Sequence, residues 1–344
     1  MSLPTSSPSA PPRAPSGPPR ASSGRRRFAL RIVASLLVLG VLASLLDRGE
    51  IFARLSDFVR RSPLVWAGSL ALFVLLHAGG AMKWRLFLSL ASPTSGRLPV
   101  RSALRFYAAG LFANLCLPTM IGGDVVRAGL ALGASKEKEA VVLGSLADRL
   151  ADLLALGILS AAAAALSPSA REALAQRSIS PATIVVAFVG LLLAGVVALV
   201  LLLRASASTR LSARFAKVMG EVRGAAAALR GRPGPAVLGF LLCLALQSGF
   251  ILLNAWIGGA IGIDLDLAAW FLVVPLAKIA AMLPLSLGGI GVREVAVGEL
   301  MAPLGVAREI AVAQSLVWQS VLVAGSLAAG VFAAAAGEGK RGRS

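Results

Sequence analysis

Histidine, cysteine and charged side chains are scarce in this sequence of 344 residues. One histidine and two cysteines, Cys116 and Cys243, supply no ligand set for zinc or an iron–sulfur cluster and no disulfide framework. Charged residues make up only 15% of the chain, against about 25% in soluble domains. The scarcity of charge excludes an ordinary soluble protein, and the scarcity of metal-ligating residues means that no metal or cofactor is expected.

Long apolar segments are present instead. Hydrophobic residues make up 57% of the chain, and its mean hydropathy is +0.82. A helix that crosses a bilayer needs about 20 mostly apolar residues. Six segments meet or approach this requirement, and they predict an all-α integral membrane protein. These segments are residues 30–46, 63–82, 140–166, 182–203, 235–258 and 310–336.

An irregular phrase, L-P-x-x-x-G-G-x-x-x-R, occurs twice within apolar sequence. One copy runs from Leu117 to Arg127, and the other runs from Leu283 to Arg293. A proline and two adjacent glycines interrupt the hydrogen-bond ladder of a membrane helix. Matching interruptions in two halves of a chain are the best sequence indication of a transporter site between inverted repeats.

The lysines and arginines are distributed unevenly between the predicted connections, and this indicates a topology. They are concentrated in the N-terminal tail, in residues 83–105 and 204–232, and at the C-terminus. Residues 47–62 balance arginine with acid, and 167–181 and 259–267 hold few basic residues or none. The positive-inside rule therefore places both termini and the two basic connections in the cytoplasm.

This topology leaves two segments that must enter and leave the membrane on the same face. They are residues 106–126, from the cytoplasm, and 268–304, from the opposite side. The predicted fold is an inverted repeat of span, span, re-entrant hairpin and span, giving six full spans plus two hairpins (eight membrane elements). The alternative is eight ordinary spans, which would place the acid-balanced or neutral loops inside.

The predicted organisation has two membrane repeats with polar extensions. The first repeat covers 28–175, and the second covers 176–336. Residues 1–27, rich in Pro, Ser and Arg, predict a disordered basic tail. Residues 204–232 have apolar residues at helical spacing and predict an amphipathic helix on the cytoplasmic leaflet. Residues 337–344 form a second cytoplasmic tail.

Several charged side chains fall inside these membrane elements, where an uncompensated charge costs roughly 2.5–3.5 kcal/mol. Asp148 and Asp152 share one helix face, and we expect Arg127 to pair with one of them. Each Gly-Gly turn presents backbone N–H groups, and an arginine follows shortly after it. This combination is typical of an anion-binding site, and a phosphate headgroup is the natural anion in a lipid bilayer. Lys278, Arg293, Glu294 and Glu299 lie in the second hairpin.

Two stretches of the sequence resemble the lysylphosphatidylglycerol synthase transmembrane (flippase-like) family. The first is Phe112-Ala113-Asn114-Leu115-Cys116-Leu117-Pro118 with Gly122-Gly123-Asp124-Val125-Val126-Arg127, followed by Asp148-Arg149 and Asp152-Leu153. The second runs from Pro284 to Glu294. The resemblance covers residues 28–336 and implies a bacterial inner-membrane protein related to the lipid-flipping half of lysyl-lipid synthases. The chain ends soon after its last span, so the soluble aminoacyl-transfer activity of those synthases is not implied.

The expected function is that of a multi-pass lipid transporter or flippase-like protein, with an anionic headgroup between the hairpins. The expected partners are membrane lipids with phosphate headgroups, together with a lipid-modifying enzyme, and nucleic acid is not expected. No catalytic constellation or nucleotide motif indicates an enzyme. The alternatives are a membrane-bound transferase or accessory subunit acting on polyprenyl-phosphate-linked sugars, and a small-solute or ion carrier. The candidate headgroup-binding residues are Asn114, Pro118, Gly122, Gly123, Asp124, Arg127, Asp148, Arg149, Asp152, Pro284, Gly288, Gly289, Arg293 and Glu294.

Overall fold

The computed structural model describes residues 53, 56–58, 60–92, 98–117, 122–176, 183, 188, 190, 233–282 and 291–338. Helices account for nearly all of these residues, and no strand occurs among them. The predicted all-α class is thus confirmed for this part of the chain. Outside it lie the predicted tail 1–27, the predicted span 30–46, most of the predicted span 182–203, the linker 204–232 and most of the C-terminal tail.

Four helices are long and apolar enough to cross a bilayer. They are α3 (Pro63–Ala91), α6 (Lys138–Leu166), α10 (Pro233–Ile261) and α13 (Arg308–Glu338). They correspond to four of the predicted spans. Large apolar side chains such as Leu75, Leu241 and Val331 stay exposed on these helices. An apolar outer face is what a helix in contact with lipid requires.

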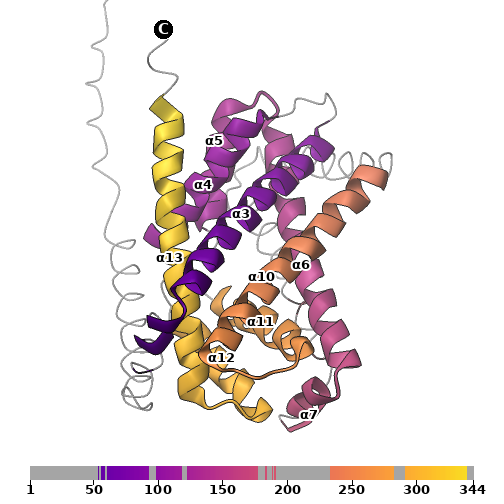
Figure 1. Cartoon of the computed structure of the whole chain (residues 1–344). Coiled ribbons are helices and arrows are strands. Elements are labelled where there is room, and N and C mark those ends of the chain that lie inside the picture. The colour runs from indigo at the N-terminus through magenta and orange to yellow at the C-terminus, as the bar shows by residue number, and fades with distance from the viewer. Residues whose placement is uncertain are drawn as a thin grey trace, which may run out of the picture.

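Shorter helices fill the space between the long ones. They are α4 (Val100–Cys116), α5 (Gly122–Ala134), α7 (Pro168–Gln176), α11 (Leu267–Met282), α12 (Val292–Met301) and the 3₁₀ turn η2 (Ala302–Leu304). α4 packs against α5 and α13, and α11 packs against α6 and α12. The pair α4–α5 lies at the end of the molecule where α13 finishes, and the pair α11–α12 lies at the opposite end (Figure 1).

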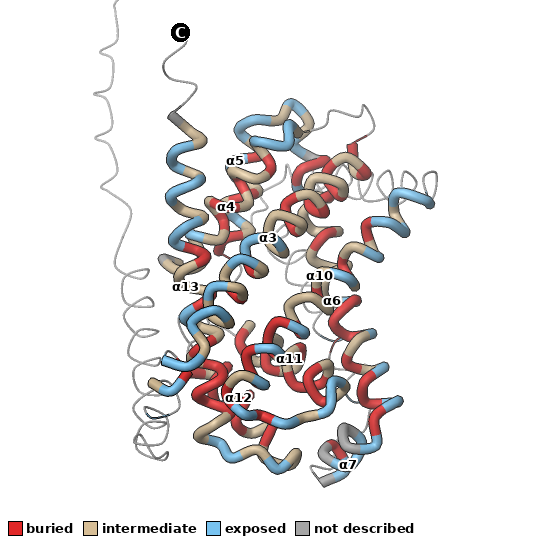
Figure 2. The backbone as a smooth tube through the Cα atoms, viewed as in Figure 1, coloured by how far each residue is buried: buried red, intermediate tan, exposed pale blue. Residues whose placement is uncertain are grey.

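Burial follows this arrangement. The first turns of α13, which pack against α12, are largely buried, whereas its last turns are mostly exposed (Figure 2). The largest fully buried side chains include Trp84, Phe73, Ile251 and Leu253, on α3 and α10. Cys243, also on α10, is fully buried, as expected of a cysteine that acts as a small core residue.

Three local predictions were wrong. Lys83 was expected in a cytoplasmic connection, but α3 continues to Ala91 because apolar residues follow this lysine, whose charge is neutralised by buried carboxylates. Residues 168–176 were expected in a loop and form the helix α7. Glu299 was expected among the buried charges, but its side chain is 38% exposed and pairs with Arg308 at 2.9 Å.

Candidate functional site

Glycines allow α4 and α5 to approach each other closely. A Cβ atom on Gly110 would lie 2.6 Å from the Gly123 carbonyl oxygen, and a Cβ atom on Gly123 would overlap the Gly110 carbonyl oxygen. Asn114 holds the start of α5, since its Oδ1 accepts a hydrogen bond of 2.7 Å from the Gly123 N–H. Gly122 is buried at the same point. The glycine pair of the first motif therefore serves the packing of two helices.

Three acidic and three basic side chains form one continuous chain of ion pairs between α3, α5 and α6. In order, this ion chain contains Asp152, Lys83, Asp148, Arg127, Asp124 and Arg149. The successive N–O distances are 2.5, 3.0, 2.9, 3.2 and 2.6 Å. The predicted pair of Arg127 with Asp148 is present, whereas Asp152 pairs with Lys83. The ion chain carries no net charge, because its positive and negative charges are equal in number.

Arg127 is buried at the cavity wall between two carboxylates and two aromatic rings. Its guanidinium carbon lies 5.1 Å from the centre of the Trp84 ring and 4.9 Å from that of the Tyr107 ring. Both distances are within the range of a cation–π interaction. The Trp84 indole N–H donates to the Ser145 hydroxyl at 3.0 Å, which ties α3 to α6 beside the ion chain. Burial of this arginine is therefore compensated by carboxylates and aromatic faces together.

The second motif has a different environment. Gly291 adopts φ 86°, and its N–H donates to Glu294 at 2.6 Å across the first turn of α12. The Arg293 Nη2 atom donates to the Gln319 Oε1 atom at 2.7 Å and lies 3.5 Å from the Glu294 carboxylate. The Arg293 Nε atom is buried without a hydrogen-bond partner among the described residues. The Arg127 Nε atom also lacks a hydrogen bond, but Arg127 contacts two carboxylates at 2.9 and 3.2 Å, so Arg293 has the weaker carboxylate pairing.

Lys278, on α11, is a cavity cation whose described contacts are to neutral groups. Its ammonium donates to the Gln247 Oε1 atom at 2.9 Å and lies 5.9 Å from the centre of the Phe250 ring. Within the part of the chain that the structure describes, no carboxylate lies within ion-pair distance of it. An amide oxygen and an aromatic ring offset its charge only in part.

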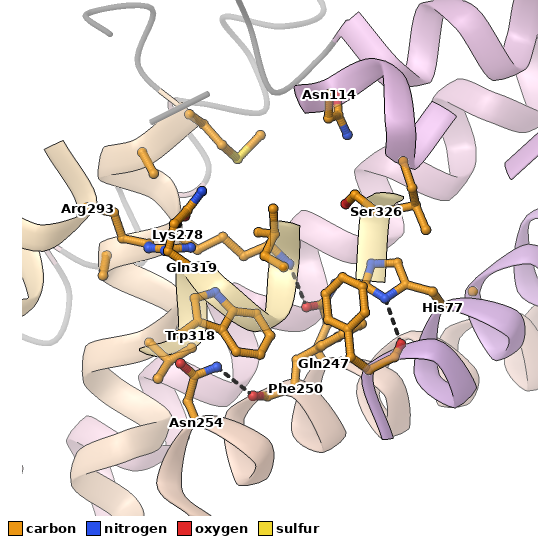
Figure 3. A pocket seen from close by; sticks show the side chains of 18 of the residues that line it. His77, Asn114, Gln247, Phe250, Asn254, Lys278, Arg293, Trp318, Gln319 and Ser326 are labelled. Atoms are coloured by element: carbon orange, nitrogen blue, oxygen red, sulfur yellow. Dashed lines mark hydrogen bonds between the residues drawn. The ribbon is translucent and has the colours of Figure 1, made fainter. Parts of the chain in front are cut away.

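These groups meet in a cavity of about 610 Å³ that is lined by residues of α3, α4, α5, α6, α10, α11, α12 and α13. A cavity of this size is typical of a site for a small molecule or a lipid headgroup. Lys278 and Arg293 lie on one side of the open space, and Asn114 and Ser326 lie across from them (Figure 3). The wall includes aromatic rings as well as charged and amide groups.

The predicted site residues fall into three groups. The first group lines the cavity and contains Asn114, Gly123, Asp124, Arg127, Arg149, Asp152 and Arg293. The second group is buried next to the lining residues and contains Gly122, Asp148 and Glu294. The third group, outside the described residues, contains Pro118, Pro284, Gly288 and Gly289. That any of them contacts a headgroup stays a prediction.

Sequence reasoning missed several polar residues of the cavity wall, among them Lys83, Gln247 and Gln319. A signal for the two glutamines was present, because each lies within a long apolar segment that contains only two carboxamides. A buried amide in a membrane helix needs a partner, and both glutamines accept a hydrogen bond from a cation.

Fold and cavity together define a multi-pass membrane protein with a polar cavity enclosed by its helices. The chain belongs to the family described as the lysylphosphatidylglycerol synthase TM region, whose model matches residues 28–330. The resemblance seen in the two sequence motifs is thereby confirmed, and membership associates the chain with a lipid-related function. No curated protein and no solved structure matches the chain significantly.

Proposed function

We propose that this protein moves a lipid with an anionic headgroup across the bilayer and holds that headgroup in the cavity between the two helix pairs. The observation that carries the proposal is the charge of the cavity wall. The ion chain is neutral and Arg293 is close to Glu294, so Lys278 contributes one positive charge in excess. An excess cation within membrane helices is costly unless a ligand neutralises it.

The lengths of the short helices support an inverted repeat with re-entrant hairpins. Helices α4, α5, α11 and α12 contain 17, 13, 16 and 10 residues. All are shorter than the roughly 20 residues that a full crossing needs. Under this proposal, α4–α5 enters from the cytoplasm and α11–α12 enters from the other side, so that both pairs end at one midplane site.

The same topology places both termini in the cytoplasm of a bacterial cell, with the helices in the inner membrane. The proposed activity is transport without a covalent step, because the described part of the cavity wall contributes ion pairs and hydrogen-bond donors, and no nucleophile paired with a base occurs among these residues. A lipid-modifying enzyme that supplies or consumes the transported lipid is the proposed partner.

The test is transbilayer movement of fluorescent phosphatidylglycerol in phosphatidylcholine vesicles, followed by quenching of the outer leaflet. In vesicles that contain the protein, labelled lipid from the inner leaflet should reach the outer leaflet and be quenched much faster than in protein-free vesicles. Arg293→Gln should slow this movement about ten-fold, since a hydrogen bond to a charged group contributes about 1.5–3 kcal/mol. Arg293→Lys should restore it only in part, because an ammonium lacks the planar fork of donors.

Arg60→Gln, on an exposed arginine outside the cavity, is the matched control and should move lipid at the wild-type rate. Equal rates with and without the protein would refute lipid transport. Unfolding temperatures of the purified variants would show whether a slow variant is merely unfolded.

A further inference from the structure

The hydrogen bonds of three carboxamides fix which end of each amide faces its partner. Gln247 accepts from Lys278, Gln319 accepts from Arg293, and Asn114 accepts from a backbone N–H. All three partners can only donate, so each carboxamide must turn its oxygen toward them. The amide nitrogens, for which the described residues provide no recorded acceptor, are left as free donors. All three carboxamides line the cavity.

The two carboxylates in the described part of the cavity wall, in contrast to the carboxamide nitrogens, are already paired with cations. Asp124 pairs with Arg127 and Arg149, and Asp152 pairs with Lys83. Neither acid is free to bind a ligand ammonium group. Among the charged side chains and the three carboxamides, the groups left for a ligand are therefore the Lys278 ammonium and the amide N–H groups, which are donors. The Gln314 Oε1 atom is a neutral acceptor in the same wall.

We propose that Lys278 is the principal anion-binding residue of the cavity, assisted by the Gln247 and Gln319 amides, and that its ligand is a phosphate group with one net negative charge. This inference rests on the proposed function and specifies its site. A phosphodiester supplies acceptor oxygens for several donors at once, and one negative charge neutralises the single excess cation. A zwitterionic headgroup would bring an ammonium to a wall without a free carboxylate.

This assignment separates the two arginines of the repeated motif. Arg127 is 4% exposed, held by two carboxylates and enclosed by two aromatic rings, so its binding capacity is already used within the protein. Arg293 has a single carboxylate contact, at 3.5 Å from Glu294, and Lys278 lies in the same wall. The headgroup is thus bound by the second half of the chain, and the first half provides a neutral wall.

The experiment measures the unfolding temperature of the full-length protein in detergent with three additives. These are dihexanoyl phosphatidylglycerol, dihexanoyl phosphatidylcholine and inorganic phosphate. A ligand that binds only the folded state raises the unfolding temperature by mass action. The phosphatidylglycerol should stabilise the wild type and Lys278→Arg, whereas Lys278→Met should require about ten-fold more of it or show no shift.

Without additive, Lys278→Met should unfold at a higher temperature than the wild type, because an excess cation has been removed from the protein interior. A merely structural lysine would give the opposite sign. Lys138→Met, on an exposed lysine at the start of α6, is the matched control and should behave like the wild type with all three additives.

The remaining outcomes separate this inference from the proposed function. Equal stabilisation of the wild type and Lys278→Met by phosphatidylglycerol would overturn the role of Lys278. Equal stabilisation of the wild type by phosphatidylcholine and by phosphatidylglycerol would overturn the proposed preference for a headgroup with one net negative charge. Stabilisation by inorganic phosphate alone would support the anion site but identify a solute rather than a lipid. No stabilisation of a wild type that still moves fluorescent phosphatidylglycerol would overturn the site and leave lipid transport standing.

Discussion

At the scale of single residues, Asp148 is the centre of the ion chain. One of its carboxylate oxygens lies 3.0 Å from Lys83, and the other lies 2.9 Å from Arg127. Its side chain is 1% exposed, so water contributes nothing to its solvation. Loss of either cation would leave the buried Asp148 carboxylate with one cationic partner instead of two. The free-energy cost of a buried charge that has lost a partner usually exceeds the net stabilisation that the ion pair itself provides.

We therefore expect a strong coupling between Arg127 and Asp148. Arg127→Met should lower the apparent free energy of unfolding in detergent by about 3–5 kcal/mol, because it leaves buried carboxylates under-compensated. The double variant with Asp148→Asn should lose less than the single one, since two neutral pairs, Lys83–Asp152 and Arg149–Asp124, remain. A double-mutant cycle should give a coupling energy of about 1–3 kcal/mol.

Arg101→Met, on an exposed arginine of α4, is the control and should change the unfolding free energy by less than about 0.5 kcal/mol. If the losses of unfolding free energy in the two single variants simply add up in the double variant, the two side chains do not stabilise each other.

The sequence predicted part of this ion chain. Arg127 was expected to pair with Asp148 or Asp152, because each charge would be costly alone in a bilayer, and the structure shows the pair with Asp148. Lys83 was assigned to a loop, since it is followed by Arg85 and basic residues usually mark the cytoplasmic end of a span. Its long side chain instead reaches two acids on α6. Only the packing of α3 on α6 reveals this, and no pattern within either segment encodes it.

At the scale of helices, the contact between α4 and α5 depends on two glycines that face each other. Gly110 and Gly123 place backbone against backbone, and no side chain separates the helices at this point. Such an approach also aligns Asn114 with the N–H of Gly123. The same contact therefore sets both the distance between the helices and the start of α5.

Gly123→Ala should destabilise the protein by about 1–3 kcal/mol, because the added methyl group overlaps backbone atoms that cannot move aside. Gly129→Ala is a control on the same helix, where an added Cβ atom meets nothing within 4 Å. It should be neutral or stabilising by up to about 1 kcal/mol, as alanine favours helix. Denaturant titrations of both variants would compare them, and equal effects would argue against the close contact.

Element positions were predictable where composition alone decides them. The four long helices follow from uninterrupted apolar length, and the ends of α4 and α11 follow from the breaks at Pro118 and Pro284. The helix α7 was missed because its residues are neither apolar nor part of a motif. Its place is set by contacts with η2 and α11, which come from the distant second half.

At the scale of the whole molecule, the two pairs of short helices lie at opposite ends (Figure 1). Residues of both pairs line the cavity. The start of α4 and the end of α5 lie at the same end as the finish of α13 (Figure 1). If the molecule spans a bilayer in this way, each pair opens to one aqueous side only. The distribution of loop charge predicts this topology, and the topology stays a prediction.

Single cysteines provide the test, in a background that lacks Cys116 and Cys243. Cysteines at Val100 and Lys136 flank α4–α5, and both should resist a membrane-impermeant thiol reagent in intact cells. Cysteines at Asp264 and Ala307 flank α11–α12, and both should react. All four positions are exposed in the structure. Opposite labelling of the two members of either pair would show a full crossing and contradict the hairpin proposal.

The ion chain also constrains the order in which the protein is assembled. Its six members come from α3, α5 and α6, so all have been synthesised once α6 is complete. Because chains fold from the N-terminus during synthesis, these charges are expected to neutralise one another before the ribosome has synthesised α10 to α13. The cavity wall, by contrast, needs residues from α10 to α13 and is completed last.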